Sequence, residues 1–200
     1  LGWVYGLLLG AAARLRLVDD LAGEVAEAAD AMRQLRATLR PDSPSPQNPA
    51  KHLAGMLEGR VPVIWGAELL APVARRWKTQ LNENAKTAAY YEEMPELNHN
   101  SVVGLQFPGS LTERIAVVEL VSQQHVHPRT VIRQGVTRDL LAQAGVPVYH
   151  VEAQGESRLA QQVNMIQMGD YVSFYLAIAN GVDPTPIENI DWLKEQLARA

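Results

Sequence analysis

The chain has 200 residues, of which 47% are hydrophobic and 20% charged, with a net charge of −4. This composition is typical of a globular domain, and the thinly spread basic residues argue against a general nucleic-acid binder. The absence of cysteine excludes disulfides, zinc–thiolate sites, iron–sulfur clusters and cysteine nucleophiles, and cytoplasm is the expected compartment.

The first 13 residues, LGWVYGLLLGAAA, carry no charge and predict an apolar helix. The stretch is too short to span a membrane as a helix, and no basic segment precedes it. We therefore favour a helix buried against another part of the protein over a targeting segment. Because the chain starts inside an apolar helix, we also expect it to be part of a longer protein.

A second helical pattern runs from about residue 19 to residue 40, with apolar residues at three- and four-residue spacing. The segment PDSPSPQNP, residues 41–49, then places four prolines in nine positions and cannot continue a helix. It predicts a linker. The chain is therefore divided into N-terminal helices with a linker, residues 1–47, and a domain over residues 48–200.

The second segment alternates apolar strands with helices. Strands are predicted at 61–65, 115–121 and 146–151, with a further short strand within 87–91. Helices are predicted at 48–59 (with Asn48 as N-cap and proline first), 69–81, 128–144, 157–179 and 186–198. The alternation predicts an α/β fold, a parallel β-sheet flanked by helices in three layers. Ligands of such sheets collect at the carboxyl ends of the strands.

Common catalytic motifs are missing: the sequence contains no Walker motif, GxGxxG, HExxH or GxSxG. Glu68 follows the first strand and would repel an anion at the N-terminus of the next helix. His125 and His127 alternate, but no carboxylate or cysteine is near them in sequence, so no metal site is predicted. His52 and His150 are interpreted as structural.

Two polar segments carry the candidate chemistry, WKTQLNENAK at 77–86 and EEMPELNHN at 92–100. Glu83 and His99 lie 16 positions apart, and both could lie near one sheet edge. A carboxylate with an imidazole suits proton transfer. The alternative is that Glu83 merely ends a helix and His99 belongs to a turn. Likewise, Lys194 in the last helix is equally explained as a solvated lysine.

These segments resemble a known family. NPAKHLAGMLEGRVPVIWGAELLAPVARRWKTQLNENAK, EEMPELNHNSVVG and GESRLAQQVNMIQMGDYVSFYLAIANGVDPTPIENIDWLK are similar to the C-terminal half of the bifunctional phosphoglucose/phosphomannose isomerases. Those proteins carry two sugar isomerase (SIS) domains in tandem. The resemblance covers about residues 48–197 and is specific because RWKTQLNENAK, PELNHN and NGVDPTP occur together in this order.

The resemblance implies interconversion of glucose 6-phosphate or mannose 6-phosphate with fructose 6-phosphate, without metal or organic cofactor. Glu83 matches the base that moves a proton between C1 and C2 through a cis-enediol. His99 matches the ring-opening histidine, which the neighbouring subunit donates, and Lys194 matches a lysine that assists ring opening. Further residues are assigned to substrate binding: Thr185, which is associated with the mannose epimer, Asn82 and Asn98.

The resemblance also implies what this chain lacks. In the family, the serines and threonines that hold the sugar phosphate belong to the first SIS domain, and no stretch here matches them. We therefore expect a homodimer with a shared site that is poorly active alone. The alternative is a non-catalytic SIS module that binds a sugar phosphate or mediates assembly. DNA binding is disfavoured because no helix-turn-helix with a basic recognition helix is evident.

Overall fold

The computed structural model describes residues 2–105 and 107–200 of the chain. Within these residues four strands form one parallel sheet in the order β2-β1-β3-β4. The strands are β1 (Val61–Ala67), β2 (Tyr90–Met94), β3 (Ile115–Val121) and β4 (Val148–Glu152). The predicted α/β class is therefore confirmed, and all four predicted strands are present.

The position of each strand in the sheet follows from its side chains. All seven residues of β3, the sequence IAVVELV, are buried, as a strand covered on both faces requires. β1 lies beside it and is also largely buried, whereas β2 and β4 form the edges and expose residues. The tentative strand begins later than predicted, at residue 90, and before it the side chains of Asn82 and Asn180 donate to the backbone oxygens of residues 87 and 85.

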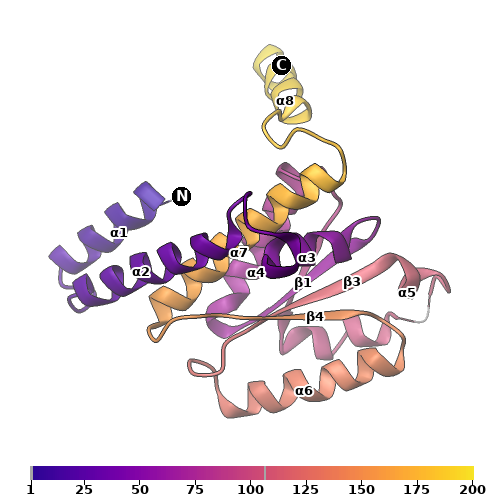
Figure 1. Ribbon diagram of the computed structural model, residues 1–200, viewed down its shortest axis with the longest axis horizontal. Helices are drawn as coiled ribbons and strands as arrows, with labels where there is room; N and C mark the ends of the chain where they lie inside the picture. Colours follow the sequence, from indigo (N-terminus) through magenta and orange to yellow (C-terminus); the bar gives the residue numbers. More distant parts are fainter. Residues whose placement is uncertain (1, 106) are drawn as a thin grey trace.

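Helices cover both faces of the sheet (Figure 1). One face carries α3 (Pro49–Leu57), α4 (Ala71–Glu83) and α7 (Arg158–Ala179), and the other carries α6 (Pro128–Gln143). Side chains of β1 alternate between the two cores: Ile64 packs with the α3, α4 and α7 layer, and Trp65 packs on the side of α6. This alternation fixes which later segments lie on which face.

The contact between α4 and α7 depends on one glycine. The Trp77 indole is 1% exposed and donates an Nε1–H hydrogen bond to the Met165 carbonyl oxygen at 2.8 Å. A Cβ at Gly169 would lie only 2.5 Å from that Nε1. Only glycine therefore fits between the tryptophan and α7.

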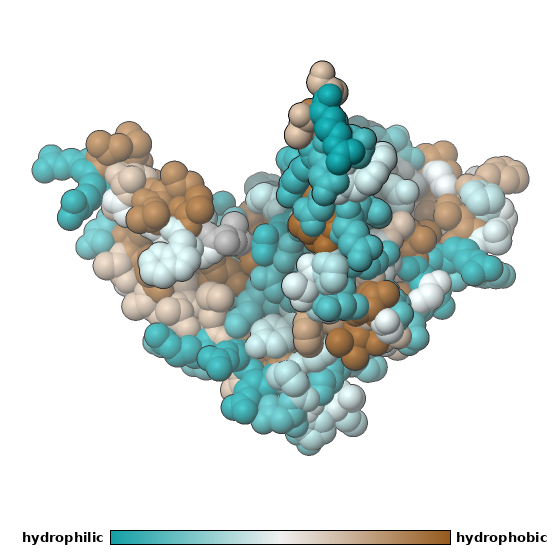
Figure 2. Space-filling view, turned by 90° about the horizontal axis from the view of Figure 1, so that it is seen from above, coloured by the Kyte–Doolittle hydropathy of each residue, from teal (hydrophilic) through white to brown (hydrophobic). Residues whose placement is uncertain are grey.

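The N-terminal segment forms α1 (Gly2–Arg14) and α2 (Ala22–Leu39). The expectation that α1 is buried is wrong for this chain, because none of its residues is buried. Tyr5 and Leu9 pack partly against α2 and α7, while the remaining apolar side chains face outward, as Figure 2 shows at the left. By contrast, α2 packs along α7, and Leu39 is fully buried in the core.

The proline-rich linker is fastened to the domain that follows it. It contains one short 3-10 helix, η1 (Ser45–Gln47). The Lys51 ammonium donates to the carbonyl oxygens of Pro41 and Ser43 at 2.7 and 2.8 Å. Asn48 caps α3 by accepting two backbone N–H groups at 3.1 Å, which confirms the predicted cap. The division of the chain at residue 47 stays a prediction.

The remaining elements are short, except for the last. They are η2 (Glu68–Leu70), η3 (Glu96–Asn98), η4 (Ser101–Val103) and α5 (Leu111–Arg114). The final helix, α8 (Glu188–Arg199), projects from the body in Figure 1 and has no buried residue. Of the helices in residues 2–105 and 107–200, none is long and apolar enough to cross a membrane.

Candidate active site

The candidate site lies at the amino ends of the strands. The helices α4 and α7 each start beyond the carboxyl end of a parallel strand and run back along the sheet. Their last turns, at Glu83 and Ala179, therefore lie beside each other at the opposite end. Asn180 joins the two segments by donating to the Ala85 carbonyl oxygen at 3.1 Å and the Thr87 hydroxyl at 2.9 Å.

A cavity of 590 Å³ opens between these two segments. Its walls are the end of α4, the loop after α7 and the first turn of α8, with these lining residues: Asn82, Glu83, Lys86, Val182, Asp183, Pro186, Ile187, Glu188, Asn189 and Ile190. Three of them are carboxylates and one is a lysine. The cavity therefore suits a proton-transfer base and is poorly suited to hold a phosphate, which two excess negative charges would repel.

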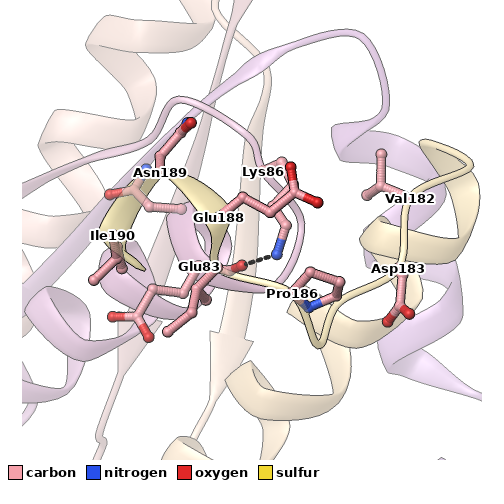
Figure 3. Close-up of a pocket in the computed structure, with 10 residues that line it drawn as sticks. Glu83, Lys86, Val182, Asp183, Pro186, Glu188, Asn189 and Ile190 are labelled. Atoms are coloured by element: carbon pink, nitrogen blue, oxygen red, sulfur yellow. Dashed lines mark hydrogen bonds between the residues drawn. The ribbon is translucent and has the colours of Figure 1, made fainter. Parts of the chain in front are cut away.

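Lys86 links the two walls of this cavity. Its ammonium donates to the backbone oxygen of Glu83 at 2.5 Å (Figure 3) and to that of Pro184 at 3.2 Å. The loop after α7 is thereby held against the end of α4.

The carboxyl of Asp183, on the loop wall, has a lowered pKa. The main cause is the Thr185 amide, which donates to Asp183 Oδ1 at 2.8 Å, followed by the Thr185 hydroxyl. The positive charge of Lys86 lowers the pKa further. A lowered pKa keeps Asp183 ionised, so the cavity retains its negative charge near neutral pH.

The structure gathers some of the predicted site residues and separates others. Asn82 lines the cavity beside Glu83 and also donates to the Thr87 carbonyl oxygen at 2.8 Å. Thr185 lies on the loop wall without lining the cavity. Lys194 is 67% exposed, pairs with Asp191 at 3.5 Å, and does not line the cavity.

His99 and Asn98 lie on the other face of the sheet. Leu97, beside them, is fully buried in the core under α6, and Asn98 donates to the Thr137 hydroxyl of α6 at 2.9 Å. Glu83 ends α4 on the opposite face. Both candidate residues flank the edge strand β2, as the sequence allowed, but one chain does not bring them together.

The carboxyl ends of the strands, where ligands were expected, are occupied by the chain's own carboxylates. Glu68 accepts the His127 amide at 3.0 Å and the Thr130 hydroxyl at 2.6 Å, at the start of α6. Glu27 accepts the Glu156 amide at 2.6 Å, at the start of α7. Glu68 thus caps the N-terminus of α6. The sequence suggested instead that it repels anions at the N-terminus of the helix directly after it.

Hydrogen bonds from these partners lower the pKa of both carboxyls. For Glu68 the Thr130 hydroxyl is the largest cause, and for Glu27 the Ser157 side chain is the largest. An ionised carboxylate at a helix N-terminus is favourable because exposed N–H groups gather there. These two glutamates therefore act as caps at the edge where a ligand was expected.

The paired histidines have other partners. His125 Nε2 donates to the Glu156 carbonyl oxygen at 2.6 Å, and His127 Nδ1 accepts the Arg129 amide at 3.1 Å, which caps α6. His150 lies 3.5 Å from the buried carboxylate of Glu119. In residues 2–105 and 107–200 no group of three or more metal-binding side chains is close enough to hold an ion.

The sequence interpretation missed three charged residues of the cavity, Lys86, Asp183 and Glu188. Signals for two of them were present: Lys86 follows Glu83 by three positions in the candidate segment 77–86, and Asp183 lies in the NGVDPTP segment. No comparable signal marked Glu188, because only the fold brings the start of α8 to the end of α4.

The parallel sheet, its two helical layers and the carboxylate-lined cavity define a domain of the sugar isomerase (SIS) class. The sequence model described as "Bacterial phospho-glucose isomerase C-terminal SIS domain" matches residues 46–197. The chain belongs to this family.

Curated relatives give the same result. The bifunctional phosphoglucose/phosphomannose isomerase of Caldicellulosiruptor bescii is 36% identical over 199 residues, which are 99% of this chain and 58% of that protein. The protein of the same name from Aquifex aeolicus is 32% identical over 85% of this chain and 52% of its own length. This chain therefore spans only about half the length of the relatives it matches.

Solved structures share the fold. A glucose-6-phosphate isomerase-like protein from Thermus thermophilus superposes with a TM-score of 0.68 at 25% identity. The match covers 79% of this chain and 52% of that one. This chain thus resembles about half of that longer chain.

Proposed function

We propose that this chain supplies the proton-transfer half of an aldose–ketose isomerase. The reaction converts glucose 6-phosphate or mannose 6-phosphate into fructose 6-phosphate through a cis-enediol, in the cytoplasm and without a cofactor. The observation that carries the proposal is the position of Glu83, which lines the cavity. It lies in the segment matched by the isomerase family.

Glu83 acts as the base. The hydrogen on C2 of the open-chain aldose is acidic because the C1 carbonyl delocalises the resulting charge. One carboxylate within reach of C2 and C1 removes this proton, and the C1 oxygen takes up a proton to give the cis-enediol. The C2 hydroxyl then releases its proton to become the ketone, and the carboxyl returns the first proton to C1. Asn82, on the same turn of α4, lies at the cavity wall where it can contact the sugar.

His99 opens the sugar ring from a second copy of the chain. An imidazole titrates near neutral pH and can protonate the ring oxygen. Since Glu83 and His99 lie on opposite faces of one sheet, the two meet only when a second chain presents its His99. This supports the expected homodimer with a shared site, in which Asn98 holds the histidine loop through Thr137.

Lys194 assists ring opening from α8. This helix starts in the cavity wall at residues 188–190, and Lys194 lies about 6 Å further along the helix axis. Thr185 contributes to substrate binding from the loop that joins α7 to α8. Both assignments require α8 to lie over the cavity in the assembled enzyme.

The phosphate is held elsewhere. The cavity carries three carboxylates against one lysine, so its charge opposes an anion. Binding energy from the phosphate positions the reacting carbons in such substrates. The chain alone is therefore expected to turn over slowly, and the missing half of the relatives is the expected source of the anchor.

The lack of a segment that matches the family's phosphate-binding residues supports one alternative, a non-catalytic SIS module that binds a sugar phosphate or mediates assembly. The two functions differ in what Glu83 does. In the enzyme it is indispensable for proton transfer, whereas in the module it is one wall residue among ten.

The experiment uses fructose 6-phosphate in deuterated water and follows deuterium at C1 by NMR, alongside formation of the two aldoses. This exchange reports enediol formation even when turnover is slow. Glu83→Gln should abolish the exchange while sugar-phosphate binding persists, and Glu58→Gln, an exposed control outside the cavity, should leave it intact. Exchange that survives Glu83→Gln would refute the assignment. Binding without any exchange in the wild-type chain or the longer protein would favour the module.

A further inference from the structure

Lys86 has a backbone conformation that lysine rarely adopts. Its φ is +53°, in the left-handed region, where asparagine or glycine is accommodated with less strain. Strained residues of this kind persist where the surrounding structure requires them and cluster at functional sites. A lysine at this position therefore indicates that its side chain contributes a specific contact.

That contact joins two segments that are distant in sequence. The ammonium donates to the Glu83 and Pro184 backbone oxygens, and Pro184 is 98 positions away along the chain. Hydrogen bonds from a charged donor are stronger than neutral ones. Figure 3 shows Lys86 between Glu83 and the loop segment that carries Asp183 and Pro186.

We infer that Lys86 is a positioning residue that fastens the loop of residues 180–187 to the end of α4 and so fixes the shape of the cavity around Glu83. Because both of its hydrogen bonds go to backbone oxygens, the ammonium shapes the site rather than taking part in proton transfer. The clamp itself is independent of the reaction, whereas its consequence for catalysis depends on the proposed isomerase function.

The test measures amide hydrogen exchange at Gly181, Val182 and Thr185. The first two N–H groups donate to carbonyl oxygens in the last turn of α7, and that of Thr185 donates to Asp183 within the loop. Lys86→Asn keeps a residue that tolerates the left-handed region but is too short to reach Pro184. We expect loop exchange to accelerate about tenfold, and Lys86→Arg to restore most of the protection. The matched control is Arg16→Asn, at a second basic residue with φ of +56° far from the cavity in sequence.

A second measurement follows the Asp183 carboxyl by NMR over pH. Lys86→Asn removes the nearby positive charge, so the pKa of Asp183 should rise towards its ordinary value in this variant and return in Lys86→Arg. A merely destabilising substitution would not give this pattern. Loop exchange that stays at the wild-type rate in Lys86→Asn, or that accelerates equally in Arg16→Asn, would overturn the clamp.

The catalytic consequence is measured separately. With the clamp removed, KM for fructose 6-phosphate in the deuterium-exchange assay should rise about tenfold, more than kcat falls, because the loop no longer closes the wall. If Glu83→Gln leaves deuterium exchange at C1 intact, the proposed function fails. The amide-exchange measurements on the loop then still test whether Lys86 fastens it to α4. If Glu83→Gln abolishes exchange and Lys86→Asn changes neither constant, the positioning role fails on its own.

Discussion

Glu83 and His99 flank the same edge strand but lie on opposite faces of the sheet. Glu83 ends α4, which packs in the layer of α3 and α7, and His99 follows Leu97, which is buried under α6. The sheet separates them, so rearranging one side chain cannot bring them together. A site that uses both residues therefore has to be built from two chains.

The apolar face of α1 should drive association of the isolated chain. Trp3 and Leu7 are 89% and 70% exposed. Contact of such large apolar side chains with water is unfavourable, and exposed apolar patches of this kind mark interaction sites. Replacing both with serine and glutamine should shift sedimentation towards the monomer. Ile132→Gln, at an α6 position that is 58% exposed, is the control. An unchanged sedimentation profile in the double variant would exclude α1 as the contact.

Two glycine substitutions should have opposite effects on stability. In Gly169→Ala the new methyl group would overlap the Trp77 ring, whose Nε1 lies 2.5 Å from the ideal Cβ position, and overpacking of this kind costs about 1–3 kcal/mol. In Gly55→Ala, on the exposed side of α3, nothing lies within 4 Å, and the change should stabilise the chain by about 0.5–1 kcal/mol. Urea unfolding of both variants tests the packing, and equal midpoints would contradict it.

Glu68 should make stability depend on pH in the acid range. Its carboxyl pKa is lowered below the ordinary value of 4.5, mainly by the Thr130 hydroxyl and then by the His127 amide. The stabilisation is therefore complete above about pH 4.5 and is lost as the pH falls through the pKa of the folded state. Glu68→Gln should lower the free energy of unfolding at neutral pH and match the wild type once the pH lies below the pKa of the folded state. Glu58→Gln is the control, and a loss that is equal at both pH values would contradict this cause.

Most of the fold could be predicted from the sequence because its signals are local. The strand 115–121 is apolar at nearly every position, and Asn48 followed by proline marks the start of α3. The order of strand and helix even implies that Glu83, at the end of α4, lies at the amino end of the sheet. A ligand was nevertheless expected at the carboxyl ends of the strands, which is the end of the sheet opposite to Glu83.

Other features depend on contacts that no local pattern reveals. The apolar sequence of α1 predicted burial, but within residues 2–105 and 107–200 the only buried residues in its cluster are Ala28, Leu159 and Ala160. Glu68 caps α6 because Thr130, 62 positions away, is brought beside it. For the same reason the sequence placed Glu83 in a candidate site without identifying Lys86 as its clamp.

The most direct test of the account mixes two inactive variants. Glu83→Gln and His99→Gln are purified separately and as mixed dimers, and deuterium exchange at C1 of fructose 6-phosphate is measured for each. A shared site gives one intact active site per mixed dimer, so a random mixture should recover about a quarter of the wild-type rate while each variant alone stays inactive. If the mixture stays as inactive as its components, the two residues do not act in one site shared between chains.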